Sequence, residues 1–294
     1  MSTNDICLII LQYNKSNLTL DCLNSIKEKD PNFNPNRIVI ADNDSDVIHK
    51  EALKGARDLF PRAEILYHDE NYGFGVAHNM IMQSVKEKYS LFLNNDTILI
   101  NDALSKIYSE INSSKANFVT GTLYNKDGSF QENCGGYFLF PHPVKHLYLN
   151  ILNKFAEKSK SKHNYCNGAL LALKTDDFRQ VGGFDRRLFM YTEDLDLMIK
   201  LNKEYPKFHG YRLRDAKVIH LGGASALQLW TNDEKIKCQI EQGNKVVKRH
   251  YGWFHNFVYA AIYAGAKVTA ALMGVLAGSN KKKELIKAFY RITL

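Results

Sequence analysis

The chain has only five cysteines and six prolines among its 294 residues. Cysteine is therefore too rare for a small domain held together by disulfides, and proline is too rare for a collagen-like chain. The cysteines are odd in number and have no CxxC spacing, and the first residues do not read as a signal peptide, so we expect free thiols in a reducing cytoplasm. Walker A, GxSxG and HExxH motifs are also missing, which argues against three common kinds of catalytic site. With 45% hydrophobic and 24% charged residues, the composition is that of a globular protein of one or two domains.

The first 247 residues carry almost no net charge. The chain carries a net charge of +8, and residues 248–294 contribute +7 of it through Lys248, Arg249, Lys267, Lys281, Lys282, Lys283, Lys287 and Arg291. A nucleic-acid-binding surface would spread this charge over a face of the folded domain. We therefore expect no nucleic-acid partner, and we assign the charge to the C-terminal segment.

Apolar runs at residues 6–11, 37–41, 63–67 and 90–93 alternate with helical patterns in the first half of the chain. The helical patterns include one capped at Ser16 or Asn17, one near residues 47–60 and one around residues 76–88. This alternation predicts a doubly wound α/β fold. The pattern loosens over residues 124–164, returns at residues 166–173, and predicts two further strands at residues 210–213 and 217–221.

Polar clusters follow the predicted strands at residues 12–14, 42–44 and 94–96, and a loop with two glycines spans residues 68–75. Ligands bind outside the carboxyl ends of parallel strands, so these clusters predict one binding crevice. Asn and Asp also end strands as ordinary turn residues, which is the alternative. A dinucleotide fingerprint is excluded, because His78 stands where the third glycine after Gly73 and Gly75 would be.

Acidic residues supply the candidate chemistry. Asp96 ends a buried strand, where its carboxylate could bind a divalent cation. Glu193, Asp194 and Asp196 share one turn among apolar residues, and a carboxylate with a raised pKa suits a general base. Acids are also favoured at a helix N-terminus for purely structural reasons. His220 ends another strand and is by itself more typical of a core histidine than of a ligand.

The order of these motifs is more specific than any one of them. Residues 12–14, 42–43, 71–75 with Asn79, 94–96, 167–169, 182–185, 191–197 and His220 with Ser225 together resemble the inverting family-2 glycosyltransferases. The resemblance spans roughly residues 5–225 and is greatest to the rhamnosyltransferase-like branch that builds bacterial surface polysaccharides. It implies a glycosyltransferase-A fold with a Rossmann-like, mostly parallel sheet over residues 1–225, followed by a helical extension over residues 226–294.

The resemblance also implies roles for particular residues. Asp194 matches the catalytic base of the family's ED motif, with Glu193 beside it, and Asp96 and His220 match ligands of Mg²⁺ or Mn²⁺. The donor nucleotide and sugar would be held by Gln12, Tyr13, Asn14, Asp42, Asn71, Gly73, Asn79 and Asn95. Asn94 departs from the family, since it replaces the first acid of the DxD metal motif and leaves one carboxylate fewer.

These residues agree with an inverting transfer from a nucleotide sugar, in which Asp194 accepts the proton of the attacking hydroxyl and a cation stabilises the leaving group. From the resemblance, we expect deoxythymidine-diphosphate rhamnose or a uridine-diphosphate hexose as donor, and a growing, lipid-linked surface glycan as acceptor. A soluble or protein acceptor is the alternative within this class. A catalytically silent nucleotide-sugar-binding or scaffold subunit is the alternative outside it.

The C-terminal segment predicts a membrane surface as a further partner. Residues 253–278 are apolar apart from Lys267, and an apolar stripe continues past the basic run at residues 281–283. Amphipathic helices with basic flanks lie at the surface of anionic membranes. We therefore expect a peripheral protein at the cytoplasmic face of the plasma membrane, and a bundle helix or a homodimer contact is the alternative.

Overall fold

The computed structural model describes residues 4–135, 159–222, 231, 234, 237–239 and 241–253. Its strands are β1 (Asn4–Gln12), β2 (Pro35–Asp42), β3 (Glu64–Tyr67), β4 (Tyr89–Asn94), β5 (Thr97–Leu99), β6 (Phe118–Tyr124), β7 (Phe130–Gln131), β8 (Cys134–Gly135), β9 (Lys160–His163), β10 (Tyr165–Cys166), β11 (Leu170–Lys174) and β12 (Gly210–His220). Its helices are α1 (Ser16–Lys29), α2 (Val47–Leu53), α3 (Ala56–Leu59), α4 (Gly73–Met82), α5 (Ala103–Ser113), α7 (Thr175–Gln180) and α8 (Glu193–Glu204).

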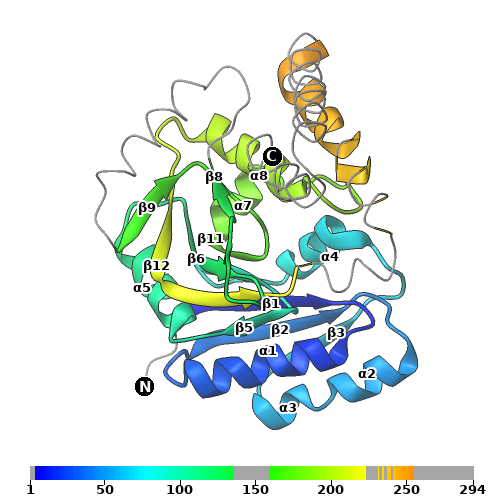
Figure 1. The fold of residues 1–294 in the computed structure, drawn as a ribbon. Helices are drawn as coiled ribbons and strands as arrows, with labels where there is room; N and C mark the ends of the chain where they lie inside the picture. The colour runs from blue at the N-terminus through cyan, green and yellow to red at the C-terminus, as the bar shows by residue number, and fades with distance from the viewer. Residues whose placement is uncertain are drawn as a thin grey trace, which may run out of the picture.

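One large twisted sheet organises the molecule, with helices on both of its faces (Figure 1). Its strands follow the order β3-β2-β1-β4-β11-β6-β12-β5, and the first four of them run parallel. β11 lies antiparallel between β4 and β6, while β12 is parallel to β6. The predicted α/β class with a Rossmann-like, mostly parallel sheet is confirmed, and the carboxyl ends of β1, β2, β3 and β4 meet at one edge.

Alternation along the strands builds two cores, one on each side of the sheet. In β1, Leu8 and Ile10 join the cluster that also contains residues of α1 and α5, whereas Cys7 and Ile9 join the cluster with α4, α7 and α8. Strands covered on both faces must be apolar throughout, which explains the continuous run at residues 6–11. The five cysteines are free, as expected.

Several element boundaries differ from the sequence prediction. The predicted helix over residues 47–60 is two helices, α2 and α3, separated at Gly55 because glycine weakens a helix interior. α4 begins at the glycines and ends at Met82, where Arg179 Nη2 donates to the Met82 carbonyl at 3.1 Å and so satisfies a helix-terminal acceptor. The two strands predicted at residues 210–213 and 217–221 are one strand, β12, with a register shift between Arg212 and Lys217.

A helix over residues 241–253 (orange in Figure 1) packs beside α8. Val246 and Val247 of this helix are buried in the same core cluster as Leu197 and Leu201 of α8. The predicted domain boundary near residue 225 stays a prediction. Among the described residues no helix combines the length and the hydrophobicity that crossing a membrane requires, and residues 254–294, where the basic apolar stripe was predicted, lie outside them.

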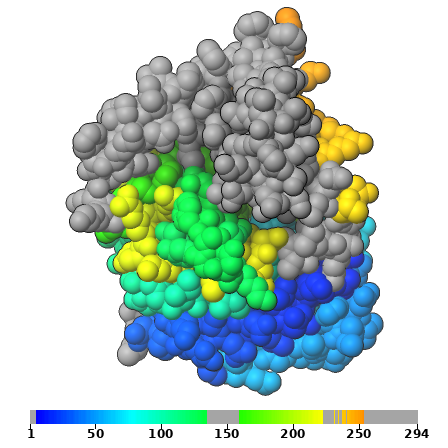
Figure 2. Space-filling model, viewed as in Figure 1, coloured from blue at the N-terminus to red at the C-terminus, as the bar shows by residue number. Residues whose placement is uncertain are grey.

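The N-terminal and central parts of the chain occupy different regions of the molecular surface. In the face shown in Figure 2, the blue and cyan first third of the chain forms the lower part, and green and yellow residues of the central part lie above it.

Candidate active site

The ends of β1 and β2 are joined by buried polar side chains. Gln12 donates through Nε2 to the Asp42 carboxylate and, at 2.9 Å, to Ser45 Oγ. Asp42 Oδ1 accepts a hydrogen bond from the Ser45 amide at 2.8 Å, and Ser45 Oγ accepts one from the Asn14 amide at 2.8 Å. Gln12 and Asp42 are only 1% and 0% exposed. Gln12 and Asp42 therefore stabilise the strand ends beneath the site. Tyr13 and Asn14, which are half-buried, are more open to a ligand.

Asn43 links this hydrogen-bond network at the ends of β1 and β2 to the loop before α4. Its Nδ2 donates to Asn71 Oδ1 at 2.8 Å, and its Oδ1 accepts from the Tyr72 amide at 3.2 Å and lies 3.1 Å from Nδ1 of the buried His68. Asn71 Oδ1 also accepts from the Gly73 amide at 3.0 Å. The predicted donor residues Asp42, Asn71 and Gly73 thus come together at one edge of the sheet, as expected from the strand ends.

Glycine is required at the start of α4 by close packing against residues 184–193. Gly73 has a φ of +71°, and a Cβ there would lie 2.1 Å from the Phe189 carbonyl oxygen. At Gly75 a Cβ would lie 2.9 Å from Phe184 Cβ and 3.7 Å from Glu193 Cβ. Gly73 and Gly75, which the sequence places in a loop, therefore lie in the first turn of α4, where this helix packs against residues 184–193.

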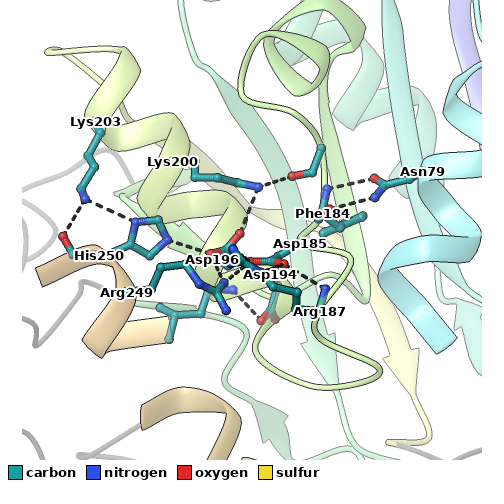
Figure 3. Close-up of polar contacts among 12 residues, drawn as sticks. Asn79, Phe184, Asp185, Arg187, Asp194, Asp196, Lys200, Lys203, Arg249 and His250 are labelled. Atoms are coloured by element: carbon teal, nitrogen blue, oxygen red, sulfur yellow. Dashed lines mark hydrogen bonds and ion pairs between the residues drawn. The ribbon is translucent and has the colours of Figure 1, made fainter. Parts of the chain in front are cut away.

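Asn79, predicted to line the donor pocket, has both ends of its amide occupied by backbone. Its Nδ2 donates to the Phe184 carbonyl at 2.8 Å, and its Oδ1 accepts from the Phe184 amide at 2.9 Å (Figure 3). Asn95 is buried as well, and its Nδ2 donates to Thr19 Oγ1 of α1 at 3.3 Å. Both side chains hold elements of the site in place, and their predicted contact with the donor stays a prediction.

Glu193 and Asp194 form the first turn of α8, directly after two strained residues. Tyr191 and Thr192 have φ values of +68° and +65°, a left-handed conformation that costs about 1–3 kcal/mol at each non-glycine residue. Such strain is found where function demands a particular geometry. The two acids also satisfy the preference for negative charge at a helix N-terminus, so the structural and functional interpretations coexist.

The carboxylate of Asp194 is held by three donors. Oδ1 accepts from the Leu195 amide at 2.7 Å, and Oδ2 accepts from Tyr165 Oη at 3.1 Å and from the Gly168 amide at 3.3 Å. Asp194 is half-buried and Glu193 is buried, and Glu193 Oε2 has no hydrogen-bond partner within the described residues. The pair therefore presents one oriented carboxylate with a second carboxyl group behind it.

The electrostatics of the pair separate the two carboxyl groups. Burial, helped by the neighbouring charge of Asp194, raises the pKa of Glu193 to about 8. Burial also raises the pKa of Asp194, while its hydrogen bonds from Leu195, Tyr165 and Gly168 oppose the rise. Two adjacent buried carboxyl groups do not both ionise near neutral pH. The three hydrogen bonds to Asp194 favour its charged form, whereas Glu193 Oε2 has no such donor among the described residues, so we expect Glu193 to keep the shared proton and Asp194 to accept one.

Asp96 and His220, the predicted metal ligands, lie together. His220 Nε2 is 3.3 Å from Asp96 Oδ1 and 3.4 Å from Asn94 Nδ2, and His220 Nδ1 lies 2.9 Å from Gln131 Oε1. An amide oxygen can only accept, so Nδ1 carries the proton and Nε2 faces the carboxylate, the usual arrangement of a ligating histidine.

This pair fits a divalent ion that takes its other ligands from a substrate diphosphate, as Mg²⁺ commonly does. Among the described residues, no group of three or more His, Cys, Asp or Glu side chains gathers as a metal cage. The shortage follows from Asn94, which stands where a second acid was expected. Asp96 and His220, with the Asn94 amide beside them, are the residues that could hold the ion.

Gly168 and Ala169 connect the two halves of the site. The Gly168 amide donates to Asp194, and the Ala169 carbonyl accepts from the Asn94 amide at 2.9 Å. Since Gly168 and Ala169 are consecutive, the Asp194 carboxylate and Asn94, two positions before Asp96, belong to one site. Sequence reasoning placed Gly168 among the motifs but missed Tyr165 and Gln131, whose short strands carry no strong local pattern.

A Rossmann-like, mostly parallel sheet with a polar edge, an acidic helix start and a carboxylate–histidine pair is the arrangement that a glycosyltransferase-A fold predicts. Residues 7–174 match Glycosyl transferase family 2, and the chain belongs to this family. The resemblance to the family-2 glycosyltransferases and the enzyme class are thereby confirmed.

Among curated proteins, the chain is similar to Rhamnosyltransferase WbbL of Escherichia coli (strain K12), with 29% identity over 154 residues. That match covers 47% of this chain, and the chain spans only 57% of the length of the relative.

Solved structures share the fold at low sequence identity. The mannosyltransferase PcManGT from Pyrobaculum calidifontis, solved with GDP-Man and Mn²⁺, has a TM-score of 0.59 at 14% identity, covering 99% of this chain and 81% of that one. GalNAc-T7, solved with UDP, GalNAc and Mn²⁺, has a TM-score of 0.58 at 14% identity, covering 81% and 50%. TarS (residues 1–349) of S. aureus has a TM-score of 0.53 at 14% identity, covering 81% and 70%.

Proposed function

We propose that the protein transfers a sugar, with inversion at the anomeric carbon, from a nucleoside-diphosphate sugar to a hydroxyl group of a growing, lipid-linked surface glycan. The observation that carries the proposal is the Asp194 carboxylate, held by Tyr165, Gly168 and Leu195 beside the protonated Glu193. The similarity to a rhamnosyltransferase favours deoxythymidine-diphosphate rhamnose as the donor, and a uridine-diphosphate hexose is second.

The proposed step is a single displacement. Asp194 takes the proton from the acceptor hydroxyl as its oxygen forms a bond to the anomeric carbon. The bond from that carbon to the diphosphate breaks on the opposite face, and the nucleoside diphosphate leaves with the electron pair. One carboxylate is sufficient for this chemistry, since no covalent glycosyl–enzyme intermediate forms. Glu193 stays neutral behind Asp194 and limits the negative charge near the acceptor.

The donor side of the site rests on polar side chains and one candidate metal pair. The edge formed by Tyr13, Asn14, Asn43 and Asn71 would receive the nucleoside. Asp96 and His220 would hold Mg²⁺ or Mn²⁺, which supplies positive charge to the leaving diphosphate. Solved structures of similar fold contain Mn²⁺ together with nucleotides, which supports a divalent cation here.

The proposal also places the protein at the cytoplasmic face of the plasma membrane as a peripheral enzyme. The charge of residues 248–294, +7 of the +8 total, supports attraction to anionic lipid. A lipid-linked acceptor would then be concentrated at the same surface. A homodimer formed through the same segment is the alternative.

Replacing Asp194 by asparagine tests the proposed base. Asp194→Asn preserves the size of the side chain and removes its ability to accept the proton, so turnover should fall by about 10²–10⁴-fold, while nucleotide binding stays unchanged. The measurements are release of nucleoside diphosphate from deoxythymidine-diphosphate rhamnose and binding of deoxythymidine diphosphate by calorimetry. Asp21→Asn, at an exposed position of α1, is the matched control. Near-normal turnover of the Asp194→Asn protein would remove Asp194 from the mechanism, and no turnover by the wild type would favour a silent binding subunit.

A further inference from the structure

Two acidic side chains near the candidate base are held by the helix over residues 241–253, called the C-terminal helix from here on. Asp196 Oδ1 lies 2.7 Å from His250 Nε2 and 3.5 Å from Arg249 Nη1, and Arg249 Nη1 also contacts Asp185 (Figure 3). Asp185 and Asp196 are separated by eleven positions in the chain but share one guanidinium. Arg249 therefore joins the beginning and the end of the segment that contains Glu193 and Asp194.

Further cations complete this cluster. Lys200 Nζ lies 3.0 Å from Asp196 Oδ2 and also donates to the Gly183 carbonyl, and Arg187 Nη2 lies 2.9 Å from Asp185 Oδ2. Lys203 Nζ of α8 donates to the His250 carbonyl at 2.9 Å and so adds a second contact between α8 and the C-terminal helix. Figure 3 shows these side chains converging from α8, residues 183–187 and the C-terminal helix.

The acids in this cluster are buried and ionised. The side chain of Asp196 is 1% exposed and that of Asp185 is 8% exposed. Burial raises the pKa of Asp185, but the hydrogen bonds from Arg187 and the charge of Arg249 outweigh it and lower the pKa to about 2. Burial likewise raises the pKa of Asp196, and His250 and Lys200 lower it below the usual value. A buried charged pair is costly to break, because removing one partner leaves an uncompensated charge.

We propose that Arg249 and His250 are positioning residues that fix residues 185–196 and thereby place the Glu193 and Asp194 carboxyl groups for the reaction. The segment needs such fixing, since Tyr191 and Thr192 are held in left-handed backbone conformations directly before the pair. On the other side, the segment rests on α4 through the Phe74 amide, which donates to the Phe189 carbonyl at 2.9 Å. The catalytic consequence rests on the proposed function, whereas the fixing of the segment does not.

The test compares Arg249→Gln and His250→Gln with Lys248→Gln in the full chain. Lys248 is exposed on the same helix one position away, so its replacement removes the same charge without touching the cluster. Amide hydrogen exchange over residues 185–196 should become at least about tenfold faster in the Arg249 and His250 variants, while β1 exchanges as in the wild type. Turnover should fall roughly tenfold with the donor KM within about twofold, because small misplacements of catalytic groups are expensive. Arg249→Lys, which keeps the charge but not the two-carboxylate geometry, should recover part of the turnover.

Two results would overturn the proposal. One is exchange and turnover in Arg249→Gln and His250→Gln equal to those of Lys248→Gln. The other is exchange that accelerates equally in β1 and residues 185–196, which would show a global loss of stability instead of local positioning. Amide exchange requires no substrate. If the wild type transfers no sugar, the proposed function fails while the exchange measurement still decides whether Arg249 and His250 fix the segment.

Discussion

The raised pKa of Glu193 makes the stability of the folded protein depend on pH in a definite direction. In the unfolded chain this carboxyl group ionises near its ordinary value of 4.5, whereas in the folded protein burial and the charge of Asp194 raise the pKa to about 8. Between these values the folded state binds more protons than the unfolded state. The contribution of Glu193 is therefore most favourable below pH 4.5, and it is lost as the pH rises toward 8.

The size of this effect follows from the shift. Each pKa unit corresponds to about 1.36 kcal/mol, so the rise from 4.5 to about 8 lowers the free energy of unfolding by at most about 4–5 kcal/mol above pH 8. That is a large fraction of the 5–15 kcal/mol typical of a folded domain. Glu193→Gln cannot ionise, so the variant should gain stability relative to the wild type as the pH increases.

Urea unfolding from pH 5 to pH 9 measures this difference. The stability of Glu193→Gln minus that of the wild type should increase by up to about 1.36 kcal/mol per pH unit and level off near pH 8. Glu28→Gln, at an exposed position of α1, is the matched control. Parallel pH profiles for the wild type and Glu193→Gln would refute the assignment of the buried proton to Glu193, and with it the division of roles between Glu193 and Asp194.

Two further predictions concern the metal pair and the C-terminal segment. Asp96→Ala should abolish the tightening of nucleoside-diphosphate binding by Mn²⁺ in calorimetry, and His220→Ala should have a smaller effect; wild-type activity unchanged by a chelator would contradict the role of Asp96. Removing residues 253–294 should release the protein from vesicles containing phosphatidylglycerol while nucleotide binding persists. Charge reversal at Lys281, Lys282 and Lys283 should weaken vesicle binding more at low salt, since each basic residue contributes about 1 kcal/mol near an anionic surface. A full-length protein that ignores vesicles but forms a dimer lost on truncation would make the segment an oligomerisation element.

The first four strands could be predicted because their signal is local. A strand covered on both faces is a short apolar run, and β1, β2 and β4 read in this way. β3 is an edge strand, and its signal is the half-buried apolar pair Ile65 and Leu66. The direction of β11 could not be predicted, because an antiparallel strand between β4 and β6 has the same apolar composition as a parallel one. Start and end positions failed where a tertiary contact decided them, as at α4, whose beginning depends on packing against Phe189 and whose end depends on Arg179.

Much of the candidate site was predictable for a related reason. Polar side chains directly after buried strands must lie at the same edge of the sheet, so Asp42, Asn71 and Asp96 could be brought together from the sequence. The groups that orient them could not. Gln131 reaches His220 from 89 positions away and Tyr165 reaches Asp194 from 29 positions away, and neither distance corresponds to a helical or strand repeat.

The four acids between residues 185 and 196 illustrate this limit most clearly. By residue type and spacing alone, Glu193, Asp194 and Asp196 are equivalent candidates for a base, and only the family resemblance singles out Asp194; Asp185 is a fourth acid of the same segment. In the fold, Asp185 and Asp196 face Arg187, Lys200, Arg249 and His250, and their pKa values fall. Glu193 and Asp194 face apolar surroundings, backbone amides and Tyr165, and their pKa values rise. Environments that push the pKa values of neighbouring acids apart assign their roles. Within the described part of the chain no cation pairs with Asp194, which supports its proposed role as the base. A carboxylate paired with arginine, as Asp185 is, has too low a pKa to accept the proton of an acceptor hydroxyl.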